Sequence, residues 1–139
     1  MRFLGASLVG VFAVAVAAVP HVPREILAYR AWDLRLLSTA IPTCNPNNSN
    51  IDVSIYHRSG RYDTTCQALE AEYNATNVKS LSYKSPSEDD WHDLCMFSTA
   101  DCSGGESALL GSITDGWEVC YPYNGFRGWS VVAHGTACV

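Results

Sequence analysis

Six cysteines restrict the folds open to this chain of 139 residues more than any other feature of its sequence. All of them follow an apolar N-terminal segment, and no two form a Cys-x-x-Cys pair. No histidine stands beside a cysteine at metal-ligand spacing, so we expect no metal site. An even number of cysteines instead predicts three disulfides in a small domain. The cysteines are Cys44, Cys66, Cys95, Cys102, Cys120 and Cys138.

The first residues have the layout of a secretory signal peptide. Arg2 precedes an apolar run over 3–16, and small residues follow at Ala17 and Ala18. A membrane anchor is the alternative, but the run is shorter than the ~20 residues that a spanning helix needs. We therefore expect residues 1–18 to be a signal peptide, 19–28 a flexible lead-in or pro-segment, and 29–139 one domain. This layout predicts a secreted, extracellular protein.

Short runs that alternate apolar and polar residues predict a mainly β domain. Residues 67–73 fit either a short helix behind a threonine cap or a strand, and the polar residues 85–90 connect two halves of the chain. Asp115-Gly116 separates two predicted strands and is a hairpin signal. The expected fold is a disulfide-stapled antiparallel sandwich or Greek key with a possible short helix. Strands are expected at 29–38, 51–56, 78–84, 94–97, 109–113, 117–121 and 129–134.

The two halves of the chain echo each other weakly. Residues 53–56 correspond to 94–97, and each segment is followed by a cysteine, Cys66 in the first half and Cys102 in the second. Each half then ends on a strand that contains serine. The alternative is that any β protein with alternating strands matches itself loosely.

The second half of the chain carries a resemblance to known proteins. Its pattern is Cys95-x-Phe97-x-x-x-x-Cys102-x-Gly104, then Gly116-x-x-x-Cys120, then Gly128-Trp129-Ser130-Val131-Val132. This pattern resembles small secreted cysteine-rich proteins of filamentous fungi, a group that includes effectors, toxins and antimicrobial proteins. Residues 93–135 also resemble one Greek-key motif of the βγ-crystallin type, which residues 51–84 match poorly. The calcium-binding string of that family is missing in register, so the resemblance implies no calcium site.

A Greek-key arrangement leads to a prediction of the disulfide pairing. The first and fourth strands of such a motif lie side by side and antiparallel, which brings Cys95 to Cys138. Cys102–Cys120 then closes the inner hairpins, and Cys44–Cys66 brackets the strand at 51–56. A rival pattern joins the two halves through Cys44–Cys138 and Cys66–Cys95.

The charge of the chain excludes some classes of partner. Nine lysines and arginines against fourteen aspartates and glutamates give a net charge of −5, and no basic cluster occurs. Neither nucleic acid nor an anionic membrane is an expected partner. The leading prediction is a secreted, non-enzymatic, effector- or toxin-like monomer that binds an unidentified protein or polysaccharide without a cofactor. A carbohydrate- or cell-wall-binding module is the alternative, and a secreted hydrolase such as a ribonuclease is the third.

Four groups of side chains are candidate sites. Exposed loop aromatics bind sugars or proteins, and core packing is the alternative for them; the candidates are Trp117, Tyr121, Tyr123 and Phe126. His57 or His92 with Asp63 or Glu70 would make an acid–base pair for a hydrolase, although surface or structural histidines are the default expectation. The carboxylates of residues 87–93 would either hold a cation or lie in a solvated loop. Asn47 and Asn74 each begin a glycosylation sequon.

Overall fold

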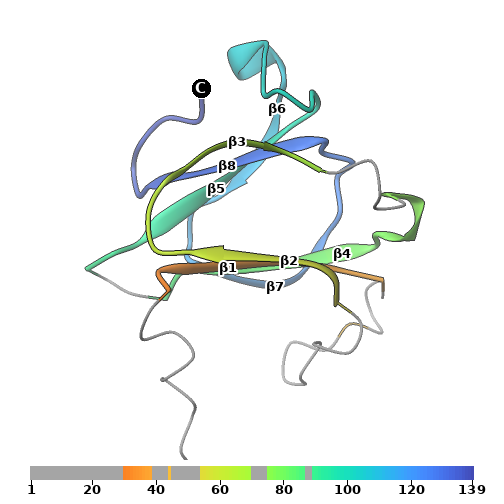
Figure 1. Ribbon diagram of the computed structural model, residues 1–139, viewed down its shortest axis with the longest axis horizontal. Helices are drawn as coiled ribbons and strands as arrows, with labels where there is room; N and C mark the ends of the chain where they lie inside the picture. Colours follow the sequence, from red (N-terminus) through yellow and green to blue (C-terminus); the bar gives the residue numbers. More distant parts are fainter. Residues whose placement is uncertain (1–29, 39–43, 45–53, 70–74, 87–88) are drawn as a thin grey trace, which may run out of the picture.

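A computed structural model describes residues 30–38, 44, 54–69, 75–86 and 89–139 of the chain. Within these ranges the protein is a sandwich of two antiparallel four-stranded sheets, ordered β2-β1-β4-β7 and β3-β8-β5-β6 (Figure 1). Two short 3₁₀ turns, η3 (Ala75–Asn77) and η4 (Gly105–Ser107), complete it. The predicted mainly β sandwich is confirmed. The strands are β1 (Trp32–Leu37), β2 (Ser54–Gly60), β3 (Thr64–Ala68), β4 (Ser80–Lys84), β5 (His92–Phe97), β6 (Leu109–Ile113), β7 (Trp117–Pro122) and β8 (Gly128–Ala133).

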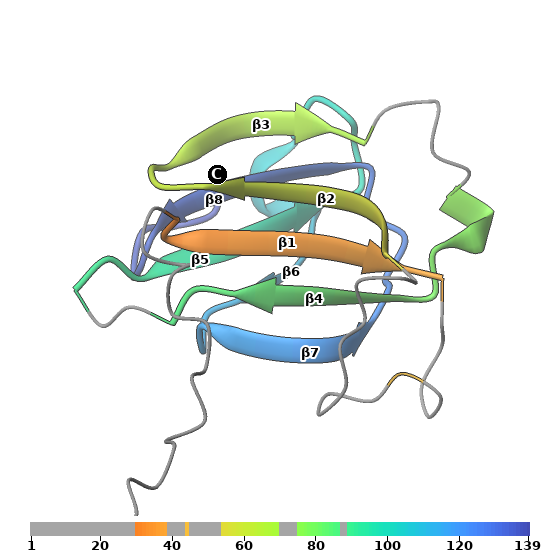
Figure 2. The ribbon, with the colours of Figure 1, turned by 60° about the horizontal axis from the view of Figure 1, so that its bottom comes forward.

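The two halves of the chain exchange one strand each. β3 belongs to the sheet built from β5, β6 and β8, and β7 belongs to the sheet built from β1, β2 and β4 (Figure 2). In each half the fourth strand lies beside the first, as β4 does with β1 and β8 with β5. The complete order 4-1-2-3 of a Greek key occurs in neither sheet, because the third strand of each half has crossed to the other sheet.

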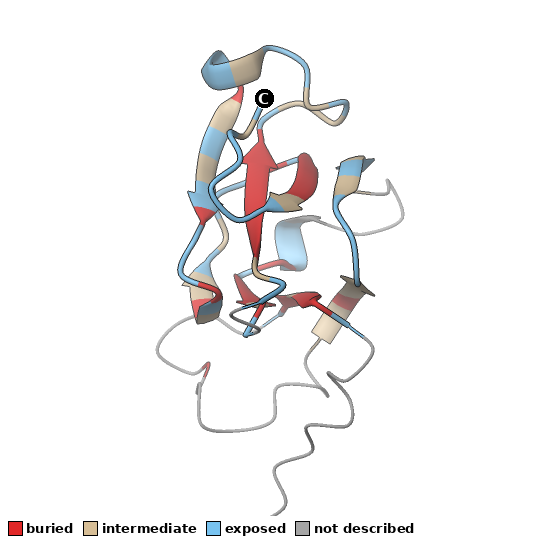
Figure 3. Cartoon of the chain, turned by 90° about the vertical axis from the view of Figure 1, so that its left-hand side faces the viewer, coloured by how far each residue is buried: buried red, intermediate tan, exposed pale blue. Residues whose placement is uncertain are grey.

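The core lies between the sheets and is formed by the alternation that the sequence displays. Leu34 and Leu36 of β1 are fully buried and share one cluster with Leu94 and Met96 of β5. Each such leucine stabilises the fold by about 1.5–3 kcal/mol relative to an exposed one. The central strand β5 is buried along its whole length, whereas the edge strands β3 and β6 carry exposed residues (Figure 3).

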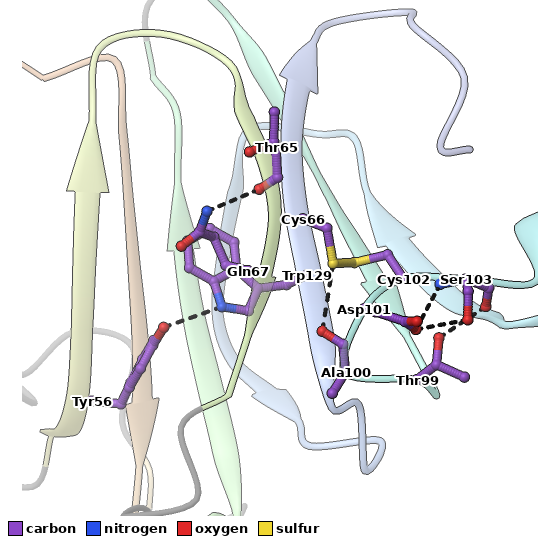
Figure 4. Close-up of a disulfide and its surroundings, with 10 residues drawn as sticks. All are labelled: Tyr56, Thr65, Cys66, Gln67, Thr99, Ala100, Asp101, Cys102, Ser103 and Trp129. Carbon is purple, nitrogen blue, oxygen red and sulfur yellow. Dashed lines mark hydrogen bonds between the residues drawn. A yellow bond between two sulfur atoms is a disulfide. The ribbon is translucent and has the colours of Figure 1, made fainter.

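Two indoles form the centre of the core. The rings of Trp32 and Trp129 meet edge to face with centroids 5.8 Å apart. The Trp129 Nε1–H donates to the Tyr56 hydroxyl oxygen at 3.1 Å, so the buried indole is satisfied (Figure 4). Trp32 Nε1–H donates to the carbonyl oxygen of Tyr62 at 2.9 Å, which ties the turn between β2 and β3 to the core.

Two local predictions are settled by the strand pairing. β6 pairs with β5 and β7 pairs with β4, so Asp115-Gly116 carries the chain from one sheet to the other, and the predicted hairpin is wrong. Gln67 and Ala68 lie in β3, which confirms the strand alternative there, while 70–74 lie outside the described residues. The signal peptide, the lead-in and 51–53 also lie outside them.

The predicted disulfide pairing is confirmed for one bridge and wrong for two. Cys95 and Cys138 are joined, with 5.6 Å between their Cα atoms, because β5 and β8 are antiparallel neighbours. Cys44 pairs with Cys120 and Cys66 with Cys102, not Cys44 with Cys66 and Cys102 with Cys120. The strand exchange is the reason: it places β3 against the second half and β7 against the first, and Figure 4 shows Cys66 bonded to Cys102.

The three disulfides suit an oxidising compartment, since cytosolic reductants keep most such pairs reduced. Among the helical segments of the described ranges, none has the length and apolarity to cross a membrane.

Candidate functional site

A cleft lies at one end of the sandwich. The turn after β2, the connection before β5 and the end of β8 meet there and enclose about 560 Å³. Acidic and aromatic side chains dominate the walls, and two histidines stand among them. The lining residues are Tyr62, Asp63, Asp89, Asp90, Trp91, His92, Ala133 and His134.

His92 is held from every side and is a structural member of the cleft. Its side chain is 5% exposed, with Nδ1 at 2.9 Å from the Asp90 carbonyl oxygen and Nε2 at 3.2 Å from Asp63 Oδ1. Both neighbours are hydrogen-bond acceptors for the ring. The ring therefore joins the β2–β3 turn to the connection before β5.

The backbone of His92 is equally fixed. Its N–H donates to the Ser85 hydroxyl oxygen at 2.9 Å, and its carbonyl oxygen accepts from the Tyr83 hydroxyl at 3.0 Å. Burial raises the pKa of Tyr83, and the negative charge of Asp93 raises it further, so this hydroxyl remains a neutral donor. The floor of the cleft is thus rigid.

His134 is the histidine with an accessible edge in the cleft. Its Nδ1 lies 2.8 Å from Oδ1 of Asp93, whose side chain is 4% exposed, while the His134 side chain is 45% exposed. The second oxygen of Asp93 accepts from the Gly135 N–H at 3.1 Å, and the imidazole stacks on Trp91 at 4.1 Å and 6°. A carboxylate only accepts, so it keeps the proton on Nδ1 and leaves Nε2 of the neutral ring as an acceptor.

A second cavity of about 370 Å³ adjoins the first, and the two share Tyr62 and Asp63. Arg58, Arg61 and Gln67 contribute to its walls, and the core indoles contribute to its floor. We call the two cavities together the Tyr62 groove. The Tyr62 side chain stands where they meet and is 75% exposed.

The aromatic candidates from the sequence lie elsewhere. Phe126 is fully buried, and Tyr121 and Tyr123 are half-buried against the core, so core packing accounts for Phe126. The Tyr123 hydroxyl donates to the Phe126 carbonyl oxygen at 2.6 Å. Trp117 is 53% exposed on the edge strand β7, with Lys84 Nζ 4.7 Å from its ring centroid. None of these four residues lines the Tyr62 groove.

The polar candidates are divided between several places. His92 does lie beside Asp63, as one of the predicted acid–base pairs requires, but His57 instead contacts Asp33 at 2.6 Å. Of the acidic segment 87–93, Asp89 and Asp90 line the cleft and Asp93 is buried. Among the described residues, no set of three or more histidine, cysteine and acidic side chains is placed to hold a metal ion. Glu70, Asn47 and Asn74 fall outside the described ranges.

The sequence did not single out Tyr62, His134 or Asp93 as partners in one site. A signal for Tyr62 was present, because an aromatic residue between Arg61 and Asp63 in a turn has little chance of reaching the core. A signal for Asp93 was the Asp-Leu dipeptide that occurs both at 33–34 and at 93–94. Comparison with protein-family models, with curated proteins and with solved structures finds no match to this chain.

Proposed function

We propose that this protein is a secreted, non-enzymatic binding protein, effector- or toxin-like in its action, that captures its target in the Tyr62 groove. The exposure of Tyr62 is the observation that carries the proposal. The Tyr62 side chain is 75% exposed and lies outside the core, although the backbone carbonyl of the same residue accepts a hydrogen bond from the core residue Trp32. Tyrosine is among the residues that contribute most to binding free energy.

The turn that carries Tyr62 is rigid, which favours binding. A side-chain carbon at Gly60 would lie 2.5 Å from the Trp32 ring, so the strand end packs directly on the indole. Because the backbone at Tyr62 is already held by the core, a ligand needs to order only the side chain, which keeps the entropy cost of binding small. The three disulfides support the secreted part of the proposal, as does the apolar segment that begins the chain.

The chemistry of the cleft favours capture over turnover. His92 has both ring nitrogens engaged, and the larger cavity, which holds the histidines, is lined by no described serine, threonine or cysteine. Ser59 and Thr64 line the smaller cavity, where no histidine among the lining residues could activate them as nucleophiles. A secreted hydrolase remains the second candidate, because Asp93 orients His134 as a general base is oriented.

One experiment separates the two candidates. The secreted full chain is immobilised and incubated with soluble polysaccharides and with protein extracts, and the retained material is compared by mass with the input. We expect an unaltered ligand, lost from Tyr62→Ala and retained by His134→Gln and by Trp117→Ala, the exposed aromatic outside the groove. A ligand recovered in cleaved form, and left intact by His134→Gln, would establish the hydrolase instead.

A further inference from the structure

We infer that the ligand of the Tyr62 groove is a neutral polysaccharide chain. The inference rests on the proposed binding function and names the class of ligand for the same site. It is carried by the exposed aromatic ring, by the charges on the two sides of that ring, and by the lack of an apolar patch around it.

The ring of Tyr62 offers a flat surface suited to a sugar. A pyranose carries C–H bonds on its faces and hydroxyl groups around its rim. The negative face of an aromatic ring attracts those C–H bonds. The ring is also less strongly hydrated than a polar side chain, so less free energy is lost when the sugar displaces water from it. Tyr62 is the most exposed aromatic ring of the groove: Trp32 and Trp129 in the smaller cavity are at most 3% exposed, and Trp91 in the larger cavity is half-buried.

The polar groups on either side of Tyr62 have opposite charges. Asp89 and Asp90 line one cavity, Arg58 and Arg61 line the other, and Asp63 lies between them and lines both. Arg58 is partly occupied, since it donates to the His57 carbonyl oxygen and stacks over Tyr56. A hydroxyl group both donates and accepts, so a chain of sugars satisfies both cavities. A polycation or a polyanion would be repelled at one end of the groove.

The surroundings of the groove do not suit a protein partner. Stable protein interfaces have an apolar centre enriched in aromatic residues. The described residues expose four large hydrophobic side chains, and each lies on a different segment: Tyr62, Leu110, Trp117 and Val139. Tyr62 therefore stands beside the half-buried Trp91 and among polar side chains, and no exposed apolar patch of the described residues surrounds it.

The shape of the groove indicates a chain rather than a single sugar. Cavities of about 560 and 370 Å³ extend to either side of Tyr62. One sugar stacked on the ring therefore has room for covalent neighbours in both directions.

The test measures retention of the full chain on insoluble neutral glycans (cellulose, chitin, β-1,3-glucan and mannan), with polygalacturonate, chitosan and polylysine as charged probes. We expect retention on at least one neutral glycan and on none of the charged probes. Tyr62→Ala should weaken that binding about tenfold or more, the loss typical of a central aromatic contact. Tyr62→Trp should preserve it, because the indole offers a larger face. Trp117→Ala is the matched control and should bind as the parent does.

The outcomes separate this inference from the function on which it rests. The inference is overturned if the protein binds none of the neutral glycans. It is also overturned if Tyr62→Ala binds them as the parent does. Binding to polylysine that depends on Tyr62 also overturns it, yet leaves the groove as a binding site. Release of soluble sugars from a bound glycan would instead overturn the non-enzymatic function. Thermal unfolding of each variant under non-reducing conditions confirms that the fold is intact.

Discussion

Asp33 and Asp93 occupy equivalent positions at the second residue of β1 and of β5, each followed by a core leucine. Both are at most 7% exposed, and both contact a histidine: Asp33 meets His57 at 2.6 Å and Asp93 meets His134 at 2.8 Å. Arg35 Nε also donates to Asp33 at 2.9 Å. A buried carboxylate without such partners would destabilise the fold by several kcal/mol. The two pairs therefore allow an aspartate on the outer face of each sheet.

These positions correct the internal repeat that the sequence predicts. The pattern matched 53–56 with 94–97, but the sheet orders make β1 the counterpart of β5, since each lies between the second and fourth strands of its half. The sequence identified His57 and His92 as polar candidates and missed their full set of partners. Which side chains meet depends on strand register and turn geometry, and neither is encoded locally.

A carboxyl pair gives a pH-dependent prediction for a single residue. A hydrogen bond with Asp115 raises the pKa of Glu118, and burial and the negative charge of Asp115 act in the same direction. The folded state thus holds this proton more tightly than the unfolded chain, so stability rises as pH falls from neutral through the raised pKa. At pH 7 the ionised Glu118 is unfavourable, and Glu118→Gln should raise the free energy of unfolding by up to about 1 kcal/mol.

Urea unfolding at pH 7 and near pH 4.5 measures this effect. The gain from Glu118→Gln should shrink at the lower pH, because the raised pKa keeps more of the parent carboxyl protonated there. Glu106→Gln, at an exposed glutamate in η4, is the control. A gain that is equal at both pH values would contradict the prediction.

At the scale of single elements, the sequence predicts strands better than it predicts their neighbours. Alternation located β1, β4, β6, β7 and β8, because burial of every second residue is a local signal. The same signal does not tell a hairpin turn from a crossover. Asp115-Gly116 has the composition of a tight hairpin, yet β6 and β7 lie in different sheets. Gly116 is required here because the segment that carries Ser85 and Trp91 packs closely against it.

Gly116 and Gly125 show the difference between a glycine required by close packing and a glycine required only by a positive φ angle. Both have positive φ, 71° and 84°. A side-chain carbon at Gly116 would lie 2.8 Å from the Ser85 carbonyl oxygen and from Trp91 Nε1, whereas none of the described atoms lies within 4 Å of one at Gly125. Gly125→Ala should cost about 1 kcal/mol for the left-handed backbone. Gly116→Ala should cost about 2–4 kcal/mol, because overpacking is added.

Chemical denaturation of the two variants compares these costs. Gly116→Ala also displaces Trp91, on which His134 stacks, so it should weaken any ligand of the Tyr62 groove, whereas Gly125→Ala should not. Equal costs for the two substitutions would mean that the contact with Ser85 and Trp91 contributes nothing.

At the scale of the whole molecule, the disulfides and the exchanged strands both join the two halves of the chain. Cys44–Cys120 and Cys66–Cys102 each join the first half of the chain to the second, and Cys95–Cys138 closes the second half on itself. Since β3 and β7 are exchanged, neither half has a complete sheet of its own. The halves therefore depend on each other for folding. Sequence alone could not predict this, because the exchange involves contacts between residues far apart in the chain.

Two of the cross-linked cysteines are held in an unusual backbone conformation. Cys102 and Cys120 have φ of 55° and 64°, a region that favours glycine. An L-residue held there costs roughly 1–2 kcal/mol. The two bridges that join the halves close loops of 76 and 36 residues. By restricting the unfolded chain, each of them stabilises the fold by about 4 kcal/mol, which more than offsets the cost of the backbone conformation.

A pair of double variants tests both terms. Cys66→Ser with Cys102→Ser removes the bridge and keeps a side chain in the left-handed region, while Cys66→Ser with Cys102→Gly removes the bridge and relieves the strain. We expect the first to lower the free energy of unfolding by about 4 kcal/mol and the second by roughly 1 kcal/mol less. Guanidinium unfolding under non-reducing conditions measures the difference, and mass mapping of unreduced peptides from the parent should recover Cys66 with Cys102. Equal losses would show that the backbone at residue 102 relaxes once the bridge is gone, and recovery of Cys66 with Cys44 would contradict the exchanged-strand topology itself.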